Sequence, residues 1–226
     1  MAQIRASSTA PASDRPLAPR LLAELDHIDL ATIETGEHTR VELFGMLPDD
    51  FDEALLLNES RLGRASLVAA QVRGSRLVDV TISGCDLSGI DWDEASLTRV
   101  EIIDARLSSA QLCRTRLRDV RFVECRIDDV NFAMATAERV RFQGCQMQRT
   151  DFRAARFAGV AWWECDLTDA EFSQITLERA QMHGSRIDGV RGAADLRPIS
   201  IDDDQRSAFA EHWLAAMGVT VAVRDD

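Results

Sequence analysis

Four of the five cysteines are the residues whose spacing most suggests chemistry. Cys85, Cys125, Cys145 and Cys165 differ by multiples of twenty positions, and Ala105 lies at the missing step. Cysteine thiols that come together can form disulfides or bind a metal such as zinc. Which of these outcomes is possible depends on the structural element that repeats every twenty residues.

Other reactive residues form no catalytic arrangement. The histidines, His27, His38, His183 and His212, are scattered, and His183 has no cysteine or serine partner at an equivalent position. The sequence contains no phosphate-binding loop, dinucleotide fingerprint or HExxH zinc motif. Acidic pairs such as Asp128 and Asp129 are expected on a convex, solvent-exposed surface that offers no enclosed pocket. We therefore predict that the chain is not an enzyme and holds neither a cofactor nor a metal.

Bulky residues recur at every fifth position from Leu62 to Ile187, except for the small Ala137, with small or β-branched residues two positions earlier. In one stretch the bulky residues are Phe122, Ile127, Phe132 and Phe142, and the smaller ones are Val120, Cys125, Val130, Ala135, Val140 and Cys145. Residues five apart lie about 140° from each other on an α-helix, and they point to opposite faces on a strand. The pattern therefore predicts a four-sided tube whose chain turns a corner every five residues and completes a coil in twenty.

The five-residue pattern resembles the pentapeptide repeat family, whose consensus is A(D/N)LXX. The closest blocks are CDLSG (Cys85 to Gly89), VNFAM (Val130 to Met134), CDLTD (Cys165 to Asp169) and AEFSQ (Ala170 to Gln174). The resemblance implies an all-β fold, a right-handed quadrilateral parallel β-helix. Its handedness comes from the resemblance and not from the spacing.

Stacked coils would place the four regularly spaced cysteines in one inward row. Neighbouring coils lie about 4.8 Å apart, and parallel Cβ atoms at that distance are slightly beyond the range that a disulfide bridges. A straight row also cannot surround a metal tetrahedrally. We therefore predict a ladder of free, buried thiols. Reduced thiols, together with the absence of an apolar secretion signal, favour a cytoplasmic protein.

The chain divides into four predicted parts. Residues 1–20 are rich in Ala, Ser and Pro and are predicted to be a disordered tail. Residues 21–60 are predicted to form an N-terminal cap and an irregular first coil that is out of register. Residues 61–192 form the pentapeptide-repeat β-helix, and residues 193–226 form a C-terminal strand and an α-helix.

The C-terminal helix is predicted to begin near Asp202 to Asp204, which supply an N-cap and favourable charge in the first turn. Phe209, Trp213 and Met217 form its apolar face, and Gly218 is a natural stop. This face is large for the end of a single rod, and relatives in the family dimerise through such helices. We predict a homodimer joined end to end through these three residues, with a lid on the chain's own tube as the alternative.

The net charge of −12 argues against direct nucleic-acid binding, and no apolar run is long enough to span a membrane. Qnr-type and mycobacterial fluoroquinolone-resistance members of the family are understood as DNA mimics that occupy the DNA site of gyrase. Between residues 61 and 190, however, 18 arginines oppose 19 acidic residues, so the rod itself is nearly neutral. We therefore predict a non-enzymatic scaffold that binds an unknown protein partner, with a DNA-mimicking modulator of DNA gyrase as the alternative.

Two surfaces are candidates for partner binding. The most continuous acidic strip contains Asp128, Asp129, Asp166 and Asp169, although arginines interrupt it. On another face, outward positions that hold Ser83, Gln143 and His183 in some coils hold Ile103, Val123 and Trp163 in others. These positions should lie along one line, flanked by Arg121, Arg141, Glu124 and Glu164. We expect this line to contact a protein partner or a second copy, and Trp163→Ala to leave the melting temperature nearly unchanged.

Overall fold

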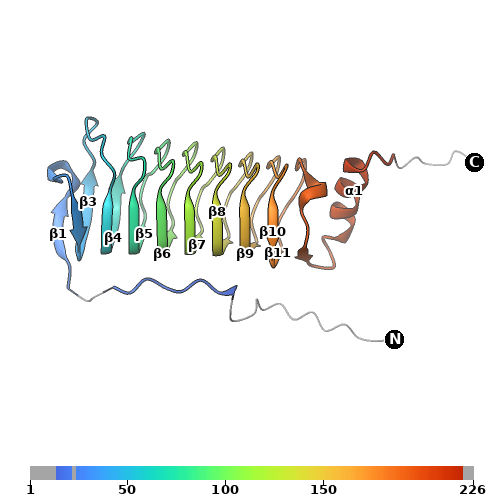
Figure 1. Cartoon of the computed structure of the whole chain (residues 1–226), viewed down its shortest axis with the longest axis horizontal. Coiled ribbons are helices and arrows are strands. Elements are labelled where there is room, and N and C mark those ends of the chain that lie inside the picture. The colour runs from blue at the N-terminus through green and yellow to red at the C-terminus, as the bar shows by residue number, and fades with distance from the viewer. Residues whose placement is uncertain (1–13, 22–23, 221–226) are drawn as a thin grey trace, which may run out of the picture.

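Parallel strands stacked in a row form a long right-handed β-helix, which an α-helix closes at its C-terminal end (Figure 1). The structure, a computed structural model, describes residues 14–21 and 24–220. The elements are β1 (Asp26–Asp29), η2 (Leu30–Thr32), β2 (Glu37–Thr39), β3 (Val41–Met46), β4 (Leu56–Ser66), β5 (Arg76–Ser83), β6 (Ser96–Ile103), β7 (Arg116–Val123), β8 (Thr136–Gln143), β9 (Arg156–Trp163), β10 (Thr176–Glu178), β11 (Ala180–His183), η3 (Ala193–Asp195), β12 (Ile199–Ile201) and α1 (Arg206–Ala216). The all-β fold predicted from the period of five is confirmed.

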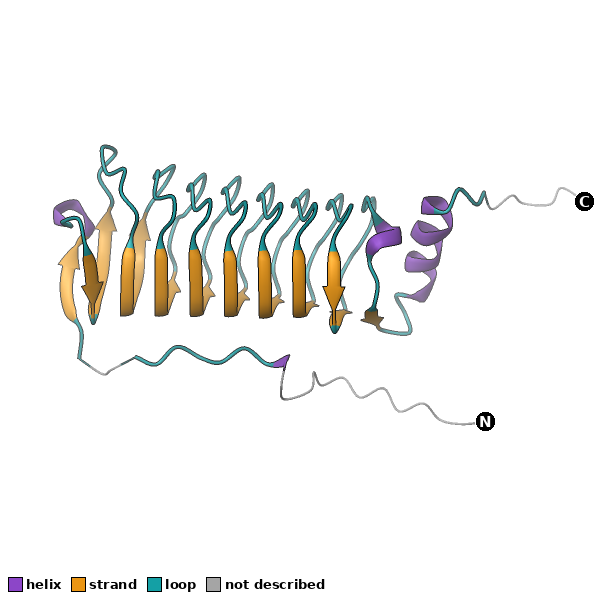
Figure 2. Ribbon diagram, in the orientation of Figure 1, coloured by secondary structure: helices purple, strands orange, loops and turns teal. Residues whose placement is uncertain are grey.

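Each coil contains twenty residues, as the pairing of the strands shows. Leu57 pairs with Leu77, Leu77 with Leu97, and Leu97 with Leu117. The strands from β4 to β9 bend around one corner and thereby cover two faces of the tube. The other two faces are joined by isolated bridges between neighbouring coils, such as that between Asp86 and Arg106. Figure 2 shows the strands side by side along the rod, with loops forming the rest of each coil.

Left-handed residues at the corners explain the five-residue period. In one coil, Asp79, Gly84, Gly89 and Glu94 have φ angles of 55°, 62°, 68° and 62°. A positive φ turns the chain sharply between two short extended sides, and it is costly for β-branched residues. Every fifth residue is therefore a corner, and the two inward positions of each side alternate with outward ones.

Stacked aromatic rings fill the second half of the tube. Phe122 and Phe142 are stacked with their ring centroids 4.8 Å apart, and Trp162 continues this column above Phe142 at 6.3 Å. In the next column, Phe132 and Phe152 stack at 5.5 Å. All five side chains are fully buried. Each such pair contributes about 0.5–1.5 kcal/mol beyond the burial of its apolar area.

The regularly spaced cysteines form the predicted ladder. Cys85, Cys125, Cys145 and Cys165 are buried and free, and backbone hydrogen bonds link the successive coils that carry them. Burial raises the pKa of the Cys85 thiol. The pKa values of Cys125 and Cys165 are raised by their hydrogen bonds to Cys145 and by burial. The same hydrogen bonds lower the pKa of Cys145, which lies between them. All four side chains belong to the buried hydrophobic core, so the row is part of the packing of the tube.

The regular coil begins earlier than the predicted boundary at residue 61. Leu57 already pairs with Leu77 at the twenty-residue spacing. The irregular coil lies before it, because Leu43 pairs with Leu62 at nineteen residues and the register shifts before Gly45 pairs with Ala65. The missing residue moves the inward side chains out of the period, which is why the sequence pattern showed this first coil as out of register.

Residues 14–21, which we name the strap, lie along the rod, with Asp14 in a 3-10 turn, Arg15 in a bend and residues 16–21 in no regular secondary structure. The backbone N–H groups of Leu17 and Arg20 donate to the carboxylates of Asp119 and Asp79. The prediction of a disordered tail is therefore wrong for residues 14–20, because hydrogen-bonded anchors hold them. Residues 1–13 of that predicted tail lie outside the described part of the chain.

The C-terminal helix α1 caps the chain's own tube. Phe209 is 1% exposed and belongs to the hydrophobic core, and Trp213 donates from Nε1 to the carbonyl of Ala193 at 2.7 Å. Met217 is 66% exposed. Gly218 follows the helix with a φ of 74°, so the predicted stop is confirmed. The predicted use of Phe209 as a dimer contact is wrong in this arrangement, because its side chain is already buried within one chain.

The start of α1 differs from the prediction. Gln205 occupies the N-cap position, and no side chain caps the helix there. The carboxylate of Asp202 instead lies 2.7 Å from Nδ1 of His183 and accepts from the N–H of Gly184 at 2.9 Å. His183 and Gly184 of the preceding coil thus bind the carboxylate of Asp202, which was predicted to cap the helix.

No helix in the described residues is long and apolar enough to cross a membrane.

Candidate protein-binding surface

One outward row of residues lies along the rod as predicted. Ile103 pairs with Val123, Val123 with Gln143, Gln143 with Trp163, and Trp163 with His183 in successive strands. Each of these residues follows a bulky inward residue, and alternation along the strand turns it outward. All five are partly exposed. We call these five residues the Trp163 row.

Arg141 covers the indole of Trp163. Its guanidinium carbon lies 4.0 Å from the centroid of the ring, which is a cation–π arrangement. Burial lowers the pKa of Arg141, and the nearby positive charges of Arg121 and Arg15 lower it further. Its Nε and Nη2 atoms are inaccessible to solvent and have no hydrogen-bond partner among the described residues. The result is a half-buried tryptophan beside a cation two of whose donor nitrogens are buried without a partner.

A shallow hollow of about 230 Å³ opens beside Trp163. It is lined by Gln143, Trp163, Glu164, His183, Gly184 and Asp202. The bond between His183 and Asp202 forms one of its walls. The sequence predicted the tryptophan but not this hollow, because Asp202 had been assigned to the helix cap.

The two sides of the Trp163 row differ in charge. On one side, Arg121 is paired with Glu101 at 2.7 Å, and Arg141 has no acidic partner among the residues that the structure describes. On the other side, the corner residues Glu124 and Glu164 are exposed. A partner that matches this surface presents an apolar centre with an acidic group near Arg141 and a basic group near the glutamates.

The predicted acidic strip is largely neutralised by arginines. Asp129 forms a bidentate ion pair with Arg149, with distances of 2.6 and 2.7 Å. Asp166 lies 3.2 Å from Arg186. Asp128 accepts from Arg126 at 2.7 Å. Burial raises the pKa of Asp128, but its hydrogen bonds from Arg126 and Ser108 outweigh that effect and lower it.

Three of the four acids of the strip, Asp128, Asp129 and Asp166, are therefore closely paired with arginines. Asp169 lies at a corner of the same strip, with a φ of 58°. An array of paired acids produces a weaker field than an array of free phosphates.

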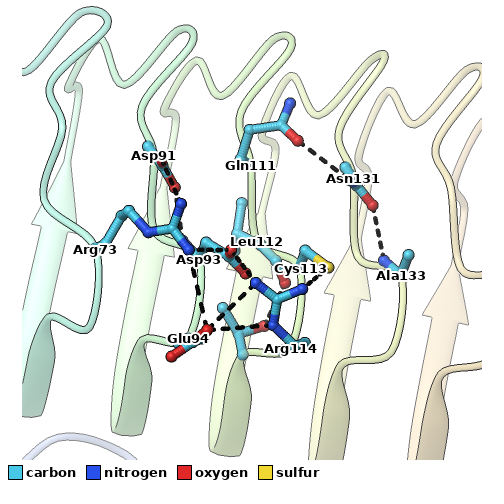
Figure 3. Close-up of polar contacts among 11 residues, drawn as sticks. Arg73, Asp91, Asp93, Glu94, Gln111, Leu112, Cys113, Arg114, Asn131 and Ala133 are labelled. Carbon is cyan, nitrogen blue, oxygen red and sulfur yellow. Dashed lines mark hydrogen bonds and ion pairs between the residues drawn. The ribbon is translucent and has the colours of Figure 1, made fainter.

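A network of two arginines and three acids, Asp91, Asp93 and Glu94, lies on a third face, and the sequence analysis did not identify it (Figure 3). Arg73 lies 2.8 Å from Oδ2 of Asp93, and Arg114 contacts the same oxygen. Arg114 also contacts Glu94 at 3.3 Å, and its Nη1 lies 3.5 Å from the sulfur of Cys113. These ion pairs connect successive coils. We assign this network to coil stacking, because its ion pairs join neighbouring coils.

The predicted dimer residues separate into two groups. Phe209 and Trp213 contact the last coil, and Met217 faces outward. Ala194, Arg197, Trp213 and Met217 line an apolar hollow of about 330 Å³ at this end. No cluster of three or more histidine, cysteine or acidic side chains in residues 14–21 and 24–220 could hold a metal ion.

Several solved structures are similar to this chain. HetL, a pentapeptide repeat protein involved in heterocyst differentiation regulation in the cyanobacterium Nostoc sp. strain PCC 7120, is 17% identical. The match covers 75% of this chain and 88% of HetL, with a TM-score of 0.34. Full-length QnrB1, a plasmid-mediated fluoroquinolone resistance protein, is 16% identical, with 78% and 98% covered and a TM-score of 0.32. A pentapeptide repeat protein of the Arabidopsis thaliana thylakoid lumen is 16% identical, with 57% and 74% covered and a TM-score of 0.25.

No curated protein matches the sequence. The sequence model of the pentapeptide repeat region matches residues 75–147, 95–161 and 115–191. These matches overlap and together span more than half of the 226 residues. They coincide with the coils in which corners, inward columns and strand pairing are most regular. The chain belongs to the pentapeptide repeat family.

Proposed function

We propose that the chain is a non-catalytic scaffold that binds a protein partner through the Trp163 row. The observation that supports this most is Trp163 itself, which lies half-buried under Arg141 and beside a hollow of about 230 Å³. Tryptophan and arginine dominate the residues that contribute most to protein interfaces. The rigid coil holds both side chains in place, so binding requires little ordering of the scaffold.

The chemistry of the row favours a protein over a nucleic acid. Ile103 and Val123 extend the apolar surface along the rod, and exposed Glu124 and Glu164 border it. Acidic residues beside the row would repel phosphates, whereas a protein can present apolar and charged side chains together. The network at Asp93 and the paired acidic strip offer no comparable apolar centre.

Trp163→Ala tests this proposal against a matched control. Val68 is 52% exposed and lies on another face, so Val68→Ala removes an exposed apolar side chain away from the row. Wild-type protein and both variants are immobilised and exposed to a lysate of the organism that encodes the protein. Retained proteins are identified by mass spectrometry, and their affinities are measured after purification. We expect a partner that binds the wild type and Val68→Ala alike but binds Trp163→Ala about 5- to 150-fold more weakly.

Equal binding to Trp163→Ala and the wild type would contradict the proposal, provided that circular dichroism shows the variant to be folded. Because Trp163 is half-buried under Arg141, we now expect its removal to lower the melting temperature measurably. The expectation of an unchanged melting temperature assumed a fully exposed indole. Trp163→Phe, which retains a ring under Arg141, should recover most of that loss.

Modulation of DNA gyrase is the alternative function. The family resemblance and the net charge of −12 support it, and the pairing of Asp128, Asp129 and Asp166 with arginines argues against it. A supercoiling assay with and without a quinolone distinguishes the two functions. Our proposal expects no change in either condition. Inhibition of supercoiling, or protection from the quinolone, would favour the alternative.

A further inference from the structure

One corner of the rod carries an alternating column of aspartates and arginines. The corner column consists of Asp79, Arg99, Asp119, Arg139, Gly159 and Arg179, one residue per coil. Asp79 and Arg99 are joined by two bonds of 2.6 and 2.5 Å, and Asp119 and Arg139 by two of 2.7 and 2.8 Å. The alternation calls for an aspartate at position 159, where the chain has glycine.

Asp14 of the strap supplies the missing carboxylate. Its Oδ1 lies 3.0 Å from Nε of Arg179, and a Cβ atom at Gly159 would lie 3.3 Å from the same oxygen. Asp14 is 7% exposed. The glycine therefore leaves the space that the carboxylate of Asp14 occupies, and a side chain at position 159 would compete for it.

Two further anchors place the strap in register with the coils. The N–H of Leu17 donates to Asp119 at 3.1 Å, and the N–H of Arg20 donates to Asp79 at 2.9 Å. The three anchors are three residues apart on the strap and two coils apart on the rod. Three residues of polyproline II chain span about 9.3 Å, and two coils span about 9.6 Å. The two spacings match for the stretch from Leu17 to Arg20. Asp14 lies in a 3-10 turn and reaches its anchor with its side chain.

The strap suits this track because prolines hold it extended. Pro16 and Pro19 directly precede the two residues whose N–H groups are anchors, Leu17 and Arg20. Proline fixes φ near the polyproline value and lowers the entropy lost on binding. The strap gives little apolar area to the rod, since Leu17 is 54% exposed. A segment held by a few polar anchors separates more readily than a core element.

We infer that the corner column is a binding track for an extended, proline-containing segment with an acidic residue, and that the strap is its resident and displaceable occupant. A partner segment fits when its carboxylate reaches Gly159 and its following anchors are three residues apart. This track lies on a corner and does not depend on the function proposed for the Trp163 row.

Substitution of Gly159 in the full-length chain tests the position of Asp14. Gly159→Asp places a carboxylate in the space of Asp14 and should release the strap. Gly144→Asp is the matched control, because Gly144 is a corner glycine with a similar φ of 63° on another corner. Trypsin cleavage after the exposed Arg20 reports release of the strap. We expect cleavage to become at least about tenfold faster in Gly159→Asp than in Gly144→Asp, since a charged hydrogen bond is lost.

A peptide tests whether the occupant can be exchanged. Leu17→Pro in the full-length chain removes one anchoring N–H and leaves the track intact. A fluorescent peptide of residues 11–21 should bind this variant more tightly than the wild type, and Gly159→Asp added to the variant should abolish binding. The peptide with Asp14→Asn should bind at least about tenfold more weakly. Circular dichroism checks that each variant is folded. Faster cleavage of Gly159→Asp without binding of the peptide would show that the strap is a permanent part of the fold, and this would overturn the inference. Equal cleavage rates for Gly159→Asp and Gly144→Asp would also overturn it.

Discussion

At the scale of single residues, burial decides which cysteines can react. Cys113 alone is partly exposed, and the other four thiols are buried. Burial raises the pKa of Cys113, although the positive charge of Arg114 acts in the opposite direction. A thiol with a raised pKa still reacts when solvent reaches it, whereas a thiol in the core must wait for the coil to open.

We therefore expect one of the five thiols to react rapidly with a colorimetric disulfide reagent in the native protein, and all five to react in urea. Cys113→Ser should remove the rapid phase. Cys145→Ser is the control and should leave it in place. Two or more rapid thiols in the native wild type would show that the ladder opens more easily than its burial implies.

The thiol ladder was predictable because burial follows the five-residue period, and so was the line of the Trp163 row. The bond between His183 and Asp202 was not. Asp202 follows the last strand and resembles a helix cap locally, and only the fold brings His183 beside it. The cover of Trp163 by Arg141 was hidden for the same reason, because it depends on the rotamers of long side chains and not on spacing.

At the scale of elements, helix α1 is a cap whose apolar face is divided between two environments. Phe209 is buried on the last coil, and Met217 is largely exposed. Phe209→Ala should lower the free energy of unfolding by about 3 kcal/mol or more, because it leaves a cavity at the end of the core. Met217→Ala should change it by less than about 0.5 kcal/mol. Urea denaturation followed by circular dichroism measures both, and similar effects for the two would contradict the assignment of α1 as a cap.

The homodimer is a separate proposal, which now depends on Met217 and the apolar hollow beside Trp213. We propose that two copies pair there while each helix caps its own tube. Light scattering after gel filtration should give the dimer mass for the wild type and the monomer mass for Met217→Asp. A wild type with the mass of a monomer at high concentration would remove the proposal.

Elements at the ends were harder to predict than the coils. The strap has no hydrophobic period, and its composition is typical of a disordered tail. Its anchors on Asp79 and Asp119 lie far away in sequence. The strap becomes ordered because the rod offers a regular set of acceptors, and such a set is visible only after the coils are stacked.

At the scale of the whole molecule, ion pairs between coils should control the response to acid. Burial raises the pKa values of Asp79 and Asp119, but hydrogen bonds from Arg99 and Arg139 and from the strap backbone outweigh it, so both pKa values are lowered. A lowered pKa contributes stability that is fully present above the ordinary value of 3.8 and is lost as the pH falls through the lowered value.

The melting temperature should accordingly be nearly constant between about pH 7 and pH 5 and should fall below about pH 4. Asp119→Asn should melt at a lower temperature than the wild type at pH 7, and the difference should narrow in acid, because the wild-type carboxyl then also becomes neutral. Thermal melts across this range measure it. A loss of stability that is complete above pH 5 would assign acid sensitivity to groups other than these aspartates.

The strap also restricts how such a rod can change in length over evolution. Coils contact only their neighbours, so duplication of one whole coil normally adds a rung and leaves the rest of the tube unchanged. Between Asp79 and Gly159, however, a single added coil would place an arginine where the strap needs an acceptor. An insertion in this stretch preserves the contacts of the strap only if two coils are added to the rod and three residues are added to the strap. Outside the coils from Asp79 to Gly159, single coils can be added without disturbing the strap. Related chains that keep the strap should therefore differ in length mainly outside these coils.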